Sequence, residues 1–312
     1  MDLLAILVII LGLGLFETIS SFDNAVINAE ILRKMSPWAR RWFLIWGILF
    51  AVFLVRGVLP LLIVWSANPT LSVMEVLTAA FSSDPRIVEA VESSAPLLLT
   101  GGGVFLIFLF FHWLFMEPKH YGLLGEKFFH GQGVWFYAVI SILLSMITWF
   151  ALKVNPMMAF SAVVGSTAFF IVHGFKQHAE LKEKEMLAGK GLGDISMLLY
   201  LEVIDATFSV DGVVGAFAFT ISVPLVIIGN GLGAFVVREF TVRNIEAVKK
   251  YKYLKNGAMY SILFLGAVML ADSFGNHVPF WISPTVTIAT VGYFFWKSMR
   301  ELKRESKMKG SE

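Results

Sequence analysis

The sequence predicts an all-α, polytopic transmembrane helix bundle. Of its 312 residues, 57% are hydrophobic and only 15% are charged, whereas soluble domains average about 45–50% apolar and about 25% charged residues. Stretches of roughly 20 apolar residues, the length a helix needs to cross a bilayer, recur along the chain. Two of these stretches carry matching acidic motifs, which indicates an internal repeat within the bundle.

Nine stretches meet this length requirement and set the order of the expected helices. Asn155-Pro156 marks the turn between the fourth and the fifth, and 222–224 marks the turn between the sixth and the seventh. The nine predicted spans are 3–24, 42–66, 97–116, 133–152, 156–175, 196–220, 222–242, 257–274 and 280–298.

The segments between the spans divide the chain into regions. We expect a first membrane half over 1–175, a cytoplasmic linker over 176–195, a second membrane half over 196–298 and a basic cytoplasmic tail over 299–312. Within the first half, the acidic segment 67–96 is expected outside the membrane, as a solvated lid or as a simple connector, with a short amphipathic helix over 71–81. The linker mixes Glu and Lys at helical spacing, which is typical of a solvated segment.

The distribution of basic residues predicts the orientation of the bundle. Alternate loops and the C-terminal tail, together with the span ends that adjoin them, hold 22 of the 25 Lys and Arg residues. Basic residues accumulate in cytoplasmic loops, so we expect the N-terminus outside and the C-terminus inside. We expect this topology in the cytoplasmic membrane of a bacterium.

Ionisable residues inside the spans are concentrated in the first and the sixth. A charge within the membrane costs several kcal/mol unless it is paired or hydrated, so these residues are candidates for a functional site. The first span contains Glu17-Thr-Ile-Ser-Ser-Phe-Asp23-Asn24, and the sixth contains Glu202, Asp205, Ser209 and Asp211. When Glu17 is aligned with Asp205, the two motifs share an acid, a Ser and an Asp at the same spacing, with an offset of 188 residues.

The predicted topology makes the two copies inverted, because the first span runs inward and the sixth runs outward. Each copy is followed by a span with an arginine, Arg56 in the first half and Arg238 in the second, at an offset of 182 residues. Inverted repeats with polar, broken helices at their interface are a transporter architecture, with the binding site near the middle of the membrane.

The helical positions of the acids predict where the helices break. At about 100° per residue, Glu17 and Asn24 share a face, whereas Asp23 lies about 240° around the helix from Glu17. We therefore expect bent or unwound backbone near 20–24 and near 209–215. Gly212, Gly215 and the adjacent serines permit such breaks, and the released carbonyls would add oxygen ligands.

The charge count predicts a cationic ligand, since five acids face at most two arginines within the membrane. Carboxylate, amide and hydroxyl oxygens without thiolates suit hard ions such as Mn²⁺, Mg²⁺ or Ca²⁺. The predicted metal ligands are Glu17, Asp23, Asn24, Asp205 and Asp211, with Ser21, Glu202, Ser209, Arg56 and Arg238 in supporting positions. The alternative is that the acids pair with the arginines and only hold the bundle together.

Several classes of function lack the residues they need. The chain has no Cys, which excludes disulfides, thiolate metal sites and cysteine nucleophiles. It has no phosphate-binding loop of the Walker type, no nucleotide-binding motif and no haem motif, so we expect no enzyme activity and no organic cofactor. A net charge of +2 gives no indication of a nucleic-acid partner. His112 and His173 fall in separate spans, where each is either a packing residue or part of a metal site or proton relay.

The acidic motifs resemble those of the TerC family of integral membrane proteins, and more closely its branch described as DUF475. Glu17, Ser21, Asp23 and Asn24 match one family pattern, and Asp205, Phe208 and Asp211 match a second. The resemblance runs from residue 10 to about residue 300, with a departure at Gly212 and Val214, where relatives resemble Asp-Ser-Ile-Pro. It implies a polytopic exporter of the broader LysE-like group, associated with Mn²⁺ efflux and tellurium resistance.

These observations together predict a secondary transporter that exports a divalent cation, with Mn²⁺ as the first candidate. Proton influx through the same carboxylates is the expected driving force, because cation export works against an inside-negative potential. Two alternatives remain open at this stage. One is a membrane interaction or assembly partner in which the acids are structural, and the other is efflux of an amino acid or another small solute.

Overall fold

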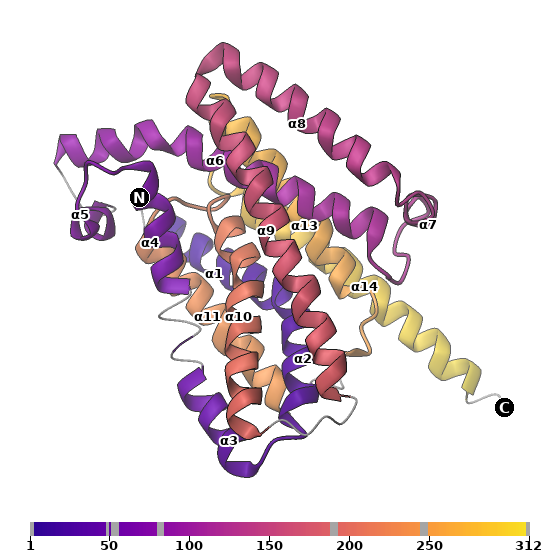
Figure 1. Cartoon of the computed structure of the whole chain (residues 1–312). Helices are drawn as coiled ribbons and strands as arrows, with labels where there is room; N and C mark the ends of the chain where they lie inside the picture. Colours follow the sequence, from indigo (N-terminus) through magenta and orange to yellow (C-terminus); the bar gives the residue numbers. More distant parts are fainter. Residues whose placement is uncertain are drawn as a thin grey trace.

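The computed structural model describes residues 3–47, 50, 56–79, 84–187, 193–243 and 249–309. Over these ranges the chain is helical and contains no strand, so the predicted all-α class is confirmed. Figure 1 shows the helices crossing one another in one bundle, with the hairpin of α8 and α9 along one side.

The helices follow the order of the predicted spans. In the first part of the chain they are α1 (Leu3–Ser20), α2 (Phe22–Leu32), α3 (Pro37–Trp42), a π-helical turn (Phe43–Gly47), α4 (Arg56–Ala67), α5 (Val73–Thr78) and α6 (Pro85–Met116). They continue with α7 (Glu126–His130), α8 (Trp135–Val154), α9 (Pro156–Leu187), α10 (Asp194–Ala216), α11 (Val223–Arg243), α13 (Leu254–Ser273) and α14 (Ile282–Lys309).

Five of the described helices are long and apolar enough to cross a membrane. They are α1, α6, α8, the 156–178 part of α9, and α13. Helices α10, α11 and α14 occupy three further predicted spans and are more than 20 residues long, but they carry more polar and charged residues. The protein is therefore a multi-pass membrane protein, and the total of nine spans stays a prediction.

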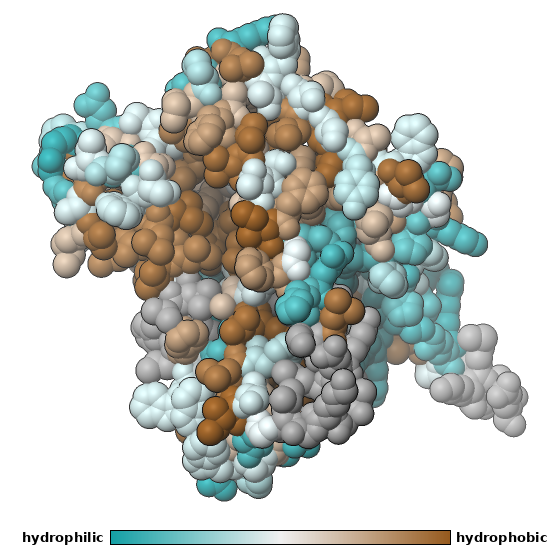
Figure 2. Space-filling model, viewed as in Figure 1, coloured by the Kyte–Doolittle hydropathy of each residue, from teal (hydrophilic) through white to brown (hydrophobic). Residues whose placement is uncertain are grey.

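The main hydrophobic core is built around α6. Its fully buried side chains include Val104, Leu106 and Trp113, and α6 packs against both α9 and α13. Apolar side chains also cover the outer surface, as Figure 2 shows over α4 and the neighbouring part of α6. Large apolar residues such as Trp149 on α8 and Phe160 on α9 are exposed, as expected for helices that face lipid.

The two halves of the molecule interlock. Helix α1 packs along α11, and its repeat counterpart α10 contacts α4, the counterpart of α11. Helices α6 and α13, which occupy the third predicted span of each half, pack against each other. If each helix is replaced by its counterpart in the other half, the α1–α11 contact becomes the α10–α4 contact, and the α6–α13 contact becomes itself. Two related repeats would give this result.

Two predicted boundaries differ from the structure. Helix α6 begins at Pro85, well before 97, because Asp84 caps its first turn through the Arg86 backbone N–H at 2.9 Å and proline suits the first helical position. Helix α9 continues to Leu187, so the first part of the predicted linker is helical. In the second span, 48–49 and 51–55 lie outside the described residues.

Candidate functional site

The first acidic motif lies at a one-residue break between two helices. Helix α1 ends at Ser20 and α2 begins at Phe22, with Ser21 between them at φ −85° and ψ 4°. The Ser21 hydroxyl donates to Glu17 Oε1 at 2.6 Å, while its backbone N–H still donates to the Glu17 carbonyl at 3.1 Å. The break predicted near 20–24 is therefore present, and it places a buried carboxylate beside it.

Arg56, the first residue of α4, neutralises Glu17. Arg56 Nε donates to Glu17 Oε1 at 2.8 Å, and Nη2 lies 2.6 Å from the same oxygen. The two residues are only 3% and 0% exposed. Because both charges are withdrawn from water, each depends on the other for compensation.

Asp205 of α10 joins this pair from the other half of the chain. The amide of Asn24 donates to Asp205 Oδ1, and Arg56 Nη1 lies 3.8 Å from Asp205 Oδ2. Glu17 and Asp205, the two acids that the repeat alignment matches, thus share one arginine. We refer to Glu17, Ser21, Asn24, Arg56 and Asp205 as the Arg56 network.

The second predicted break, near 209–215, is absent. Helix α10 runs without interruption from Asp194 to Ala216, and Ser209 Oγ donates to the Asp205 carbonyl at 2.5 Å within the helix. The glycines there serve close packing, because a Cβ at Gly212 would overlap the Glu17 carboxylate and one at Gly215 would overlap the Phe16 ring. A continuous helix is compatible with the convergence of Glu17 and Asp205, so no unwinding is needed.

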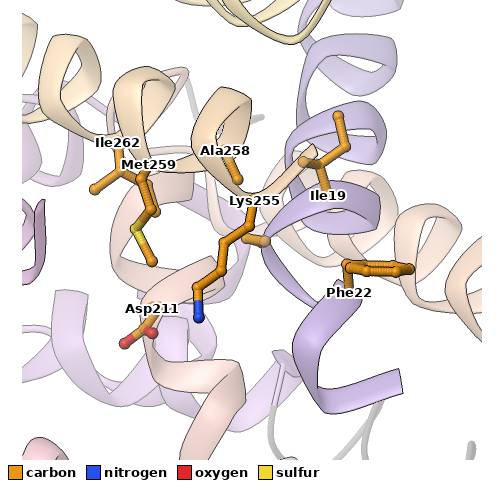
Figure 3. A pocket seen from close by; sticks show the side chains of 8 residues that line it. Ile19, Phe22, Asp211, Lys255, Ala258, Met259 and Ile262 are labelled. Atoms are coloured by element: carbon orange, nitrogen blue, oxygen red, sulfur yellow. The ribbon is translucent and has the colours of Figure 1, made fainter. Parts of the chain in front are cut away.

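Asp211 lies apart from the Arg56 network and pairs with Lys176 of α9. A cavity of about 20 Å³, enough for one water molecule, is lined by Asp211, Lys255 and apolar residues of α1, α2 and α13. Figure 3 shows the Lys255 side chain extending from α13 toward Asp211. Neither lysine was predicted as part of the site. Lys176 belonged to the predicted linker. The only sequence signal that it lies inside the bundle was its position one turn after His173, within the same helix.

Glu202 of α10 and Arg238 of α11 both approach the π-helical turn. A Cβ on Gly47 would overlap Glu202 Oε1 and lie 2.9 Å from Arg238 Nη2, so both side chains approach this glycine. Arg238 donates to the Phe43 carbonyl and its guanidinium carbon stands 4.1 Å from the centre of the Phe43 ring. Both Glu202 oxygens are buried without a hydrogen-bond partner among the described residues.

The balance of charge differs from the predicted acidic excess. Glu17, Asp205, Asp211 and Glu202 have Arg56, Lys176, Arg238 and Lys255 near them. The side chain of Asp23 lies outside the described part of the structure. Among the side chains that are described, no group of three or more His, Asp or Glu residues is arranged to hold a metal ion, so the predicted metal site stays a prediction.

The fold and these buried ion pairs define a multi-pass helical membrane protein with a polar network inside its bundle. The chain belongs to the family described as "Protein of unknown function (DUF475)", whose model matches residues 22–305. Searches of the curated proteins and of the solved structures found no match.

Proposed function

We propose that this protein is a secondary transporter that exports a divalent cation, with Mn²⁺ as the first candidate, across the cytoplasmic membrane of a bacterium. One observation carries the proposal. Glu17 Oε2 and Asn24 Oδ1, on either side of the Ser21 break, are buried oxygens without a hydrogen-bond partner among the described residues. Buried acceptors are rarely left unsatisfied, and a hard cation is the ligand that would satisfy such oxygens. The resemblance to the TerC family supports the same cargo.

Arg56 gives this proposal a mechanism. Its guanidinium already occupies the space between Glu17 and Asp205, at 2.6 Å and 3.8 Å from their oxygens. A divalent cation that enters there competes with Arg56 for the carboxylates. Binding therefore requires the guanidinium to withdraw, and release of the cation is favoured when the guanidinium returns. The broken helix at Ser21 supplies a backbone that can adjust between the two arrangements.

Protons are the proposed driving ions. Exporting a divalent cation against an inside-negative potential costs about 2.3 kcal/mol per charge per 100 mV. Carboxylates that bind either a cation or protons would couple the two movements in opposite directions. A proton gradient should accordingly accelerate cation movement in the export direction.

Uptake of Mn²⁺ by inside-out vesicles, measured with and without a proton gradient, tests the proposal. We expect uptake by the wild-type protein and an approximately tenfold loss in Asp205→Asn, equivalent to about 1.4 kcal/mol of cation binding. Glu30→Gln is the matched control, since Glu30 lies on α2, the helix that carries Asn24, but pairs with Lys249 at 2.8 Å, outside the Arg56 network. Absence of uptake of Mn²⁺, Mg²⁺ and Ca²⁺ by folded wild-type protein would overturn the proposal.

A second candidate function is supported by the near balance of buried charges. If the acids only hold the bundle together, the protein would act as a membrane interaction or assembly partner. The double variant Glu17→Gln with Arg56→Gln separates the two, because it removes both charges of one pair together. Retained fold with retained association to a defined membrane partner, and no cation uptake by the wild type, would favour this second function.

A further inference from the structure

Two histidines that are 61 residues apart in sequence form a pair inside the bundle. His112 of α6 and His173 of α9 have ring centroids only 3.8 Å apart, with the ring planes inclined at 52°. They meet because α6 and α9 pack along each other. In the sequence the two histidines are isolated residues, and the fold gives them a joint environment.

The surroundings of this histidine pair are apolar on one side and charged on the other. Phe136 of α8 meets the His112 ring edge-on at 5.4 Å, and Phe169 stacks on His173 at 5.7 Å. Helix α8 thus contributes the Phe136 ring, and α9 contributes the Phe169 ring. The charged groups that face the pair or its neighbours are Glu117 at the end of α6, Lys176 on α9, Asp211 on α10 and Lys255 on α13.

One imidazole nitrogen of the pair faces a carboxylate. His112 Nδ1 is buried and makes no hydrogen bond, although it lies 3.4 Å from Glu117 Oε1, within ion-pair distance. Glu117 Oε2 is held by Lys255 at 2.8 Å, and the Glu117 side chain is 27% exposed. The carboxylate therefore stands between the buried ring and water.

Glu117 is ionised at neutral pH. Its partial burial acts to raise its pKa, but the charge of Lys255 and the contact with His112 outweigh burial and hold the pKa of Glu117 below its ordinary range. An ionised carboxylate beside an imidazole nitrogen stabilises a proton on that nitrogen by a charge-assisted hydrogen bond.

We propose that His112 and His173 form a proton-binding site that takes up a single proton from water past Glu117. The proton binds an imidazole nitrogen and leaves again by the same route, so the site cycles between a neutral pair and a pair with one positive charge. A second proton is excluded because two imidazolium rings 3.8 Å apart would repel each other and the nearby lysines.

This site also has a connection to the buried acids, which rests on the proposed transport function. Lys176, the partner of Asp211, follows His173 by nearly one helical turn on α9. A positive charge on the histidine pair repels the Lys176 ammonium and weakens its hold on Asp211. Protonation at the pair is thereby communicated to the interior of the bundle.

Nuclear magnetic resonance of the full chain in lipid nanodiscs, with isotope-labelled histidine, tests proton binding directly. We expect the signals of His112 and His173 to move together as the pH falls, with uptake of one proton by the pair. Glu117→Gln should weaken that uptake roughly tenfold, the effect of removing a neighbouring opposite charge. His178→Gln is the matched control, since His178 is an exposed histidine on the same helix, and should leave the pair unchanged.

His112→Gln and His173→Gln assign the signals, and each variant is first checked for a folded state. Two protons taken up independently, or no titration of either ring, would overturn the site. In vesicles, a proton gradient should no longer accelerate Mn²⁺ uptake by His173→Gln, whereas it should still accelerate uptake by His178→Gln. Unchanged acceleration in His173→Gln would overturn the coupling. Proton binding without cation transport would overturn the transport proposal and the coupling, but it would leave the proton site standing.

Discussion

A few glycines set how closely the ion-paired helices approach one another. A Cβ on Gly233 would lie 2.6 Å from both the Glu17 Cβ and the Gly14 carbonyl oxygen, atoms that cannot move without shifting α1. Gly47 and Gly229, which correspond in the repeat alignment, likewise face α10 and Leu13 of α1. Small residues at these crossings allow the close helix contacts on which the Arg56 network depends.

This close contact predicts that Gly233→Ala destabilises the bundle. We expect a loss of about 1–3 kcal/mol, the usual cost of overpacking a tight interior, measured by thermal unfolding in detergent. Gly292→Ala on α14 is the matched control, because a Cβ there meets nothing within 4 Å. It should be neutral or slightly stabilising, since alanine favours a helix more than glycine does. Equal melting temperatures for the two variants would contradict the close contact.

Sequence patterns predicted part of the site at this scale. Glu17, Arg56 and Asp205 were singled out because they are charged residues in apolar spans, and the structure brings all three together. Lys176 was missed, since a lysine at the edge of a charged segment is indistinguishable from a solvated one until the packing of α9 on α10 is known. The omission of Lys176 and Lys255 together made the predicted excess of acid larger than the one that the described side chains show.

At the scale of elements, the positions of most helices followed from apolar length, and their ends depended on local signals. The Asn155-Pro156 turn between α8 and α9 was predicted correctly, because proline suits the start of a helix. The early start of α6 was missed although Asp84-Pro85 is a capping signal, because the apolar run begins later. The continuous α10 shows that Ser and Gly permit a break but do not impose one.

The end of α6 predicts a pH dependence. The Lys119 ammonium donates to the carbonyls of Trp113 and Leu114 in the last turn, and burial lowers the pKa of Lys119 to about 8, from 10.5. The folded state therefore holds this proton less tightly than the unfolded state does. Stability should rise as the pH increases between these two values, because the unfolded state binds more protons there.

Melting temperatures at pH 7.5, 9 and 10.5 check this expectation. The contribution of Lys119 is the difference between the wild type and Lys119→Gln in the slope of melting temperature against pH. The melting temperature of Lys119→Gln should rise less over this interval. Lys127→Gln, at an exposed position on α7, should keep the slope of the wild type. Parallel curves for the wild type and Lys119→Gln would show that Lys119 does not titrate as expected.

For the whole molecule, the predicted orientation can be measured directly, because the chain has no cysteine. We introduce single cysteines at the exposed positions Thr70 and Ser306, one in the predicted outer segment and one in the predicted cytoplasmic tail. A membrane-impermeant maleimide added to intact cells should label Thr70→Cys and leave Ser306→Cys unlabelled until the membrane is opened. The reverse result would invert the topology and, with it, the proposed direction of transport.

The sharing of Arg56 by two acids has a consequence for the order of biosynthesis. Glu17 and Arg56 are 39 residues apart, whereas Asn24 and Asp205 are 181 residues apart. A chain is synthesised from its N-terminus, and its N-terminal part folds first. The Glu17–Arg56 pair can therefore form long before Asp205 is translated. Helix α10 has no Lys or Arg of its own, so we expect its Asp205 carboxylate to meet a cation that is already in place. We therefore expect the second half of the chain to assemble on the first.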